Sequence, residues 1–170
     1  MRKLSPFHLK SWIEAHRDLL KPPVGNQLLW EDTELIVMIV GGPNARKDYH
    51  VDEGEEFFFQ LEGDIVLKVI EEGEFKEIPI QEGDVFLLPP CVPHSPQRPA
   101  NTVGLVLERQ RKQGELDGFQ WYCEHCGNKL YEEFFQLTHI VTQLPPLFER
   151  FYENEAHSTC QKCGIRMNPK

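Results

Sequence analysis

The sequence feature that most constrains the fold is the placement of three potential metal ligands, His50, Glu56 and His94. Two neutral imidazoles and one carboxylate bind Fe(II) on one face and leave positions open for substrate and oxygen. One extended strand would hold His50 and Glu56 about 20 Å apart, because a strand rises by roughly 3.3 Å per residue. The two can share an ion only if the chain turns between them. Residues 52–54 (DEG) predict such a turn, because glycine allows a positive φ and aspartate can bond its own backbone.

Short apolar segments separated by turns fill residues 27–109. They predict the strands Glu34–Val40, Glu56–Leu61, Ile65–Ile70, Val85–Leu88 and Val103–Leu107. We expect the turn at 52–54 to place His50 at the end of one strand and Glu56 at the start of the next. His94 is expected to come from a separate strand and turn. Many short strands at this spacing indicate a β-sandwich or barrel, so the fold class expected is dominated by β structure.

Both ends of the chain also show helical signals. Ser5 and Pro6 predict an N-cap and a first helical position, and apolar residues then recur at helical spacing. Near the other end, Pro145 or Pro146 is expected to start a helix that runs through Phe151. The sequence therefore predicts a helix before the β region and another after it.

Length and polarity predict one main domain with a small appendage. The chain has 170 residues, of which 40% are hydrophobic, and this is enough for a core. A polar stretch, Gln110–Gly118, is typical of a linker. We expect residues 1–112 to form the main domain with the N-terminal helix, and residues 113–170 to form a C-terminal metal-binding module.

The net charge of −9 argues against nucleic acid and anionic membranes as partners. The first residues contain no uninterrupted apolar run, so we expect no signal peptide. No stretch approaches the roughly 20 apolar residues that cross a bilayer. The expected location is therefore the cytoplasm.

Four of the five cysteines form two CxxCG motifs. They are Cys123, Cys126, Cys160 and Cys163. Two such thiolate pairs complete a tetrahedral shell that favours zinc or iron, and a closed shell is more often structural than catalytic. Disulfides and redox-active pairs are the alternatives, but both fit a cytosolic chain less well. The fifth residue, Cys91, either lines a pocket or is a small buried hydrophobe.

The spacing of the ligands resembles the two cupin motifs, H-x-H-x(3)-E-x(6)-G and G-x(5)-P-x-G-x(2)-H-x(3)-N. The matching positions are His50, Glu56, Gly63, Gly83, Pro89 and His94. Asp52 stands where the first motif has its second histidine, which leaves two histidines and one carboxylate. Arg98 replaces the asparagine of the second motif and suggests an anionic substrate. The resemblance implies a cupin jelly-roll barrel.

The chain more specifically resembles the bacterial 3-hydroxyanthranilate 3,4-dioxygenases. The segments that carry this are RKDYHVDEGEEFFFQLEG, LLPPCVPHSPQRP, GLVLERQR and both CxxCG motifs. The resemblance implies catalytic Fe(II) bound by His50, Glu56 and His94. It implies further catalytic and substrate-binding roles for Arg46, Arg98 and Glu108, with Glu56 also near the substrate. A second, rubredoxin-like site with iron or zinc is implied at Cys123, Cys126, Cys160 and Cys163.

The implied activity is ring opening of 3-hydroxyanthranilate by O₂ to 2-amino-3-carboxymuconate semialdehyde, which cyclises to quinolinate. That places the chain in the tryptophan–kynurenine route to NAD, and the resemblance also implies a homodimer. Arg98 can pair bidentately with the substrate carboxylate. Arg46 can stabilise negative charge that develops on dioxygen. Glu108 can hold the substrate or accept a proton.

Other functions remain open from the residues alone. A cupin of this size can be a different oxygenase or an isomerase of phosphorylated sugars, although an isomerase usually has a fuller ligand shell. A metal-sensing cupin would need a partner-binding or DNA-binding element, and this acidic chain shows no basic face. The CxxC module can also dock an electron-transfer partner, which a reaction that takes all four electrons of dioxygen reduction from its substrate does not need.

Overall fold

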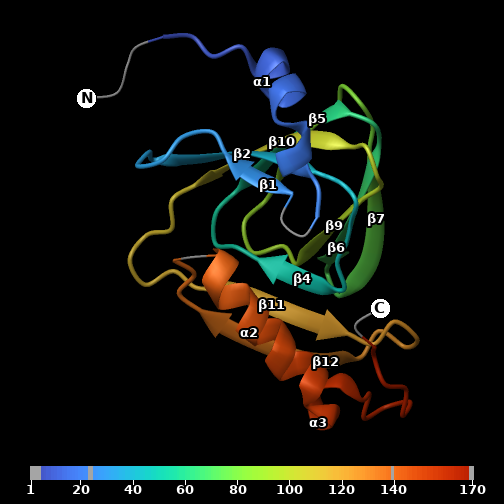
Figure 1. Ribbon diagram of the computed structural model, residues 1–170. Coiled ribbons are helices and arrows are strands. Elements are labelled where there is room, and N and C mark those ends of the chain that lie inside the picture. The colour runs from blue at the N-terminus through green and yellow to red at the C-terminus, as the bar shows by residue number, and fades with distance from the viewer. Residues whose placement is uncertain (1–4, 23–24, 139, 169–170) are drawn as a thin grey trace.

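The structure is a computed structural model that describes residues 5–22, 25–138 and 140–168. In these residues the chain forms two antiparallel sheets with a common interior, a short helix at the N-terminal side and a longer helix beside the C-terminal strands (Figure 1). This arrangement confirms the predicted cupin-type fold dominated by β structure. None of the helices described is long and apolar enough to cross a membrane.

The first sheet has the strand order β1-β2-β10-β5-β8. Its strands are β1 (Asn26–Leu28), β2 (Leu35–Gly41), β10 (Val103–Arg109), β5 (Glu56–Glu62) and β8 (Val85–Leu88). Four of the five predicted strands lie here, within two residues of the expected limits at each end. Their apolar stretches and flanking turns were therefore sufficient to identify them.

The second sheet has the order β12-β11-β4-β9-β6-β7. Its strands are β12 (Lys129–Phe135), β11 (Asp117–Tyr122), β4 (Asp48–Val51), β9 (His94–Arg98), β6 (Ile65–Glu71) and β7 (Glu74–Ile80). A short strand, β3 (Asn44–Ala45), also pairs with β9. Polar sequences such as HSPQR in β9 give little strand signal, because long-range pairing rather than local propensity places them in the sheet.

The main apolar core lies between the two sheets. Strands β5 and β6 alternate buried and partly buried residues, as expected for strands with one inward face. On β5 the inward residues are Glu56, Phe58 and Gln60. The apolar cluster consists of Met38, Val40, Phe58, Ile65, Leu67, Val69, Ile80, Leu88 and Val106. Glu56 therefore projects into the same interior as this apolar cluster.

The N-terminal helix begins later than predicted. Helix α1 spans Leu9–Ala15, and the His8 side chain caps it by accepting a hydrogen bond from the Ser11 backbone N–H. The prediction of Ser5 as N-cap and Pro6 as first helical residue is wrong, because the segment before His8 forms no helix. A short 3₁₀ helix, η1 (Arg17–Leu20), follows. Ile13 and Leu20 pack against Ile39, so these turns cover the outer side of the first sheet.

The C-terminal helix begins earlier than predicted. Helix α2 spans Ile140–Glu153 and contains Pro145 and Pro146 inside it rather than at its start. Its buried Leu147 and Phe151 pack against Trp121 of β11. This apolar contact compensates for the backbone hydrogen bonds that two prolines remove. A final turn, α3 (Glu155–Ser158), leads to the second CxxCG motif.

The C-terminal module continues the second sheet. Strand β11 pairs with β4, and Phe119 lies opposite His50 in that pairing. The polar linker is shorter than Gln110–Gly118, because β11 already begins at Asp117. The division at residues 112 and 113 stays a prediction about domain organisation. The pairing nevertheless connects the two parts directly beside the predicted metal ligands.

Candidate metal centre and active site

The three predicted metal ligands lie close together, and the chain turns between His50 and Glu56 as the sequence predicts. His50 lies near the end of β4 and Glu56 begins β5, with a turn closed by a 2.7 Å hydrogen bond from the Gly54 N–H to Asp52 Oδ1. His94 begins β9 and lies opposite His50 in the sheet. One potential ligand atom from each of these three residues lies within 4.8 Å of the others. The arrangement is therefore compact enough to hold one ion.

Glu56 and His94 form a buried charged pair. Their Oε2 and Nε2 atoms are 2.9 Å apart, and His94 Nδ1 donates to the Val92 carbonyl at 3.0 Å. Burial lowers the pKa of His94, but Glu56 outweighs it and the net shift is upward. Burial likewise raises the pKa of Glu56, but His94 outweighs it and the net shift is downward. The protonated His94 ring places a positive charge beside the Glu56 carboxylate. A bound metal cation would provide the same positive charge.

One buried atom fits a metal in particular. Among the described residues, Glu56 Oε2 accepts no hydrogen bond of normal geometry, although His94 Nε2 is close by. A buried carboxylate oxygen without a donor costs free energy unless a cation satisfies it. Two imidazoles and one carboxylate also form the donor set of a mononuclear Fe(II) site. The residues present therefore fit a divalent metal.

His50 is fixed from two sides. Its Nε2 lies 2.8 Å from Asp117 Oδ1, and its ring stacks on Phe119 at a centroid distance of 5.0 Å. Burial lowers the pKa of His50 despite the opposing effect of Asp117. A neutral imidazole is the form that binds metal. Because Asp117 contacts Nε2 of His50, the Nδ1 atom of the same ring is left available for a metal ion.

The three ligands line one cavity of about 110 Å³ together with Arg46, Arg98 and Glu108. All six residues that the sequence singled out around the first metal site are therefore brought together. Apolar residues of the core, including Phe58 and Val106, line the remaining walls. The cavity has charged groups at defined positions in the otherwise apolar interior between the two sheets.

Arg98 is the most deeply buried arginine of this cavity, with only 4% of its surface exposed. Its Nη1 donates to Gln60 Oε1 at 3.3 Å. Burial lowers the pKa of Arg98 to about 10, and the attraction of Glu56 offsets this only in part. A buried guanidinium whose described contact is a neutral amide is well suited to an anionic ligand.

Arg46 and Glu108 are held by ion pairs that the sequence did not indicate. The Arg46 guanidinium pairs with Asp48, and this pairing raises the Arg46 pKa although burial opposes it. Glu108 Oε2 accepts a hydrogen bond from Arg111 Nη1 at 2.6 Å. Burial and the nearby Glu56 raise the pKa of Glu108 to about 7. The site therefore contains a carboxyl group that can exchange a proton near neutral pH.

Two further residues of the site, Arg111 and Asp117, were missed by sequence reasoning. Arg111 lies in the stretch interpreted as a linker, and its Nη2 is 2.9 Å from Asp52 and 2.7 Å from Asp117. The one available signal was Asp52, which occupies the place of a motif histidine. Nothing local marks Arg111 or Asp117, because their proximity arises only from the pairing of β11 with β4.

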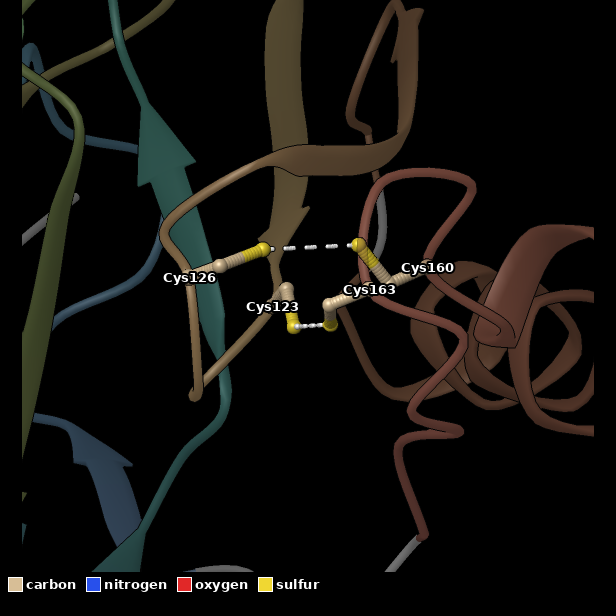
Figure 2. A group of neighbouring side chains, drawn as sticks. All are labelled: Cys123, Cys126, Cys160 and Cys163. Atoms are coloured by element: carbon tan, nitrogen blue, oxygen red, sulfur yellow. Dashed lines mark hydrogen bonds between the residues drawn. The ribbon is translucent and has the colours of Figure 1, made fainter.

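The four CxxCG cysteines form a second cluster, whose side chains converge in Figure 2. The Sγ atoms of Cys123 and Cys163 are 3.6 Å apart, and those of Cys126 and Cys160 are 3.5 Å apart. Zinc–sulfur bonds of about 2.3 Å give a tetrahedral S–S edge of about 3.8 Å, whereas a disulfide is about 2.05 Å. The spacing therefore fits a four-thiolate metal site and not two disulfides.

Both CxxCG motifs turn in the same way. The Gly127 N–H donates to the Cys123 carbonyl and the Gly164 N–H to the Cys160 carbonyl, each at 2.8 Å. Gly127 and Gly164 have φ values of 69° and 76°, which glycine adopts without strain. The repeated turn presents each pair of thiols to the same point, so the cluster is built from two local motifs.

Cys91 differs from both expectations. It is exposed and is not among the residues that line the cavity. It occupies the turn between β8 and β9 with φ of 63°, and its N–H donates to the Asp52 carbonyl at 2.7 Å. The backbone at Cys91 therefore supports the site, while its side chain faces away from the core.

Comparisons with known proteins agree with this site. The family model described as 3-hydroxyanthranilic acid dioxygenase matches residues 1–152. A 3-hydroxyanthranilate 3,4-dioxygenase of Xanthomonas euvesicatoria pv. vesicatoria is 59% identical over 161 residues, which cover 95% of this chain and 91% of the relative. A protein of the same name from Jannaschia sp. is 53% identical over 165 residues, with 96% and 92% covered.

Among solved structures, protein NMB1881 from Neisseria meningitidis superposes with a TM-score of 0.50 at 17% sequence identity. The match covers 62% of this chain and all of the other chain. At this identity the likeness concerns the fold alone. The sequence relatives, in contrast, match 95% and 96% of this chain at more than half identity.

Proposed function

From the premise that this chain belongs to the 3-hydroxyanthranilic acid dioxygenase family, we propose that it opens the ring of 3-hydroxyanthranilate with dioxygen. The chain is an oxidoreductase of the dioxygenase class. The proposed product is 2-amino-3-carboxymuconate semialdehyde, which cyclises to quinolinate, a precursor of NAD in the kynurenine route. The observation that carries the proposal is a buried two-histidine, one-carboxylate set that shares a cavity with the buried cation Arg98.

We assign Fe(II) to His50, Glu56 and His94. Iron held by these residues would supply open coordination positions for substrate and dioxygen and a route for electrons between them. The substrate supplies all the electrons that dioxygen takes up, so the reaction needs no outside reductant. The task of the remaining side chains is to bind, orient and exchange protons.

Arg98 is assigned to the substrate carboxylate. Its planar guanidinium can donate two parallel hydrogen bonds, and burial makes such a charged pair stronger than it is in water. The hydrogen bond to Gln60 orients the Arg98 guanidinium without any contribution from substrate. Arg98 would therefore select an aromatic acid over the same ring without a carboxylate.

Arg46 and Glu108 are assigned to charge and proton handling. Arg46, oriented by Asp48, offers positive charge where negative charge develops as oxygen is reduced. The carboxyl of Glu108, with a pKa of about 7, can accept the proton that the substrate hydroxyl or amine releases. Glu108 can equally orient the amine as a hydrogen-bond acceptor.

The four-cysteine cluster is assigned a structural iron or zinc ion. Four thiolates complete a tetrahedral shell and leave no position for substrate. Its cysteines are not joined by disulfides, and this supports the proposal of a cytoplasmic location. We further propose a homodimer as the working assembly, on the basis of the family resemblance.

The test is oxygen uptake by protein reconstituted anaerobically with Fe(II). Addition of 3-hydroxyanthranilate should consume one O₂ per substrate and convert the aromatic absorbance into that of a ring-opened product, whose mass increases by two oxygen atoms. The matched control is 2-aminophenol, which keeps both proposed metal-binding groups but lacks the carboxylate. Absence of turnover with iron bound at the three ligands would refute the proposed function.

A further inference from the structure

A single guanidinium connects three buried carboxylates beside the metal ligands. Arg111 lies in the loop between β10 and β11, and only 11% of its side chain is exposed. It donates to Glu108 at 2.6 Å, and its Nη2 lies 2.7 Å from Asp117 and 2.9 Å from Asp52. Its Nε also lies 3.2 Å from each Asp117 oxygen. Every described donor position of this side chain is thus directed at a carboxylate.

Each carboxylate holds a different part of the active site. Asp117 contacts His50 Nε2 at 2.8 Å. Glu108 lines the cavity. Asp52 accepts the 2.7 Å hydrogen bond that closes the turn between the first two metal ligands. Arg111 therefore contacts the partner of a ligand, a residue of the substrate cavity and the turn that brings two ligands together.

The position of Asp52 explains why an arginine is present. Where the cupin motif has a second histidine, this chain has an aspartate that turns to Arg111 and does not belong to the set of potential ligands. Without Arg111, Asp52, Glu108 and Asp117 would be three buried carboxylates that lack their shared cation. Such an arrangement is strongly unfavourable, because charges removed from water need partners.

We propose that Arg111 is a positioning residue of the metal centre, which holds Asp117 against His50 and orients Glu108 toward the cavity. The inference rests on the proposed function for the role of Glu108, but its effect on the metal does not depend on the substrate. Carboxylates that orient a ligating histidine typically change metal affinity by about 10–100-fold when they are lost. Loss of the residue that fixes such a carboxylate is expected to act in the same direction.

Positioning and simple charge predict opposite results, and this makes the proposal testable. Removing a buried positive charge near the site should tighten Fe(II) binding if only the electrostatic repulsion between the guanidinium and the metal cation mattered. If Arg111 acts by orienting Asp117 and His50, its removal should instead weaken Fe(II) binding. The sign of the change therefore separates the two explanations.

The experiment compares Arg111→Met with Arg109→Met. Arg109 is the last residue of β10 and forms a bidentate ion pair with Glu115 at 2.6 and 2.8 Å. It does not line the cavity. In each variant the cysteine site is first filled with zinc. Fe(II) affinity is then measured anaerobically by competition with a coloured chelator. Steady-state kinetics with 3-hydroxyanthranilate follow at saturating Fe(II).

We expect Arg111→Met to weaken Fe(II) binding by about tenfold or more and, with iron saturated, to lower kcat as well. Arg109→Met should stay within about threefold of the parent in both measurements, because its partly buried ion pair with Glu115 includes no residue of the cavity and no potential metal ligand. Arg111→Lys keeps the charge but loses the planar fork, so it should also weaken binding. It replaces Arg111→Met as the deciding variant if circular dichroism shows that the methionine variant is unfolded.

Unchanged or tighter Fe(II) binding in a folded Arg111 variant would overturn the proposal, as would equal weakening in Arg109→Met. The metal titration uses no substrate. A parent protein that binds Fe(II) yet leaves 3-hydroxyanthranilate intact would therefore refute the proposed function alone. A parent protein without Fe(II) affinity would refute both.

Discussion

The two metal-ligand clusters of this protein are built in opposite ways. The His50, Glu56 and His94 cluster combines nitrogen and oxygen ligands from three strands and faces a cavity of about 110 Å³. The four-cysteine cluster combines two local turns of the same kind. An incomplete ligand set beside a cavity can bind substrate, whereas four thiolates complete a shell. The contrast assigns chemistry to the first cluster and structural support to the second.

The strongest test of this contrast removes one ligand from the open site. His94→Ala should abolish binding of catalytic Fe(II) and lower kcat/KM by about three orders of magnitude or more, because the metal provides both binding and electron transfer. The thiolate site should keep its metal. Metal analysis and oxygen uptake on the same preparation measure both effects. One retained catalytic iron with near-normal turnover would show that the ligand assignment is wrong.

The second test concerns substrate binding beside the open site. Arg98→Ala should raise KM by about two orders of magnitude, which corresponds to roughly 2–3 kcal/mol for a lost charge-assisted pair. Iron content should stay normal, because Arg98 is not a ligand. Arg98→Lys keeps the charge and controls for the planar geometry of the guanidinium. A KM within threefold of the parent in the alanine variant would exclude a carboxylate clamp.

The local parts of this architecture are the parts that the sequence could predict. Asp52 and Gly54 are neighbours in the chain, so the turn that joins His50 to Glu56 was predicted correctly. The paired cysteines were predicted for the same reason. The strand Val85–Leu88 was predicted at its observed limits, because glycine and proline bound a short apolar run.

The parts that sequence reasoning missed depend on distant contacts. Arg111 was assigned to a linker, since nothing near it in the chain shows that β11 returns to β4 and brings Asp117 within reach. The start of α2 was misplaced because packing of Leu147 and Phe151 outweighs the local effect of two prolines. A strand that carries His94 was expected, but the limits of β9 were not predicted, because partner strands rather than propensity define such a polar strand.

A third test compares how readily the two clusters release metal. A strong chelator should remove metal from the open site at least about tenfold faster than from the cysteine site. The physical reason is that a chelator can enter an unfilled coordination position, whereas in a complete four-thiolate shell it must first displace a ligand. Metal content of each site is followed over time, with the thiolate absorption as a separate signal. Equal release rates would contradict the distinction between an open and a closed shell.

The smallest effect on catalysis is expected from the cysteine site itself. Replacing Cys123 and Cys126 together by serine should remove the second metal and lower the melting temperature, because that metal joins the two CxxCG motifs across the end of the module. Cys123 directly follows β11, and β11 pairs with the strand that carries His50, so some effect on the active site can travel through this strand. We nevertheless expect kcat to remain within about tenfold of the parent, or roughly 1.4 kcal/mol in barrier height. A complete thiolate shell offers no position for substrate, and the reaction takes its electrons from the substrate. A larger loss of kcat, with iron retained and an unchanged circular dichroism spectrum, would mean that the closed site takes part in turnover.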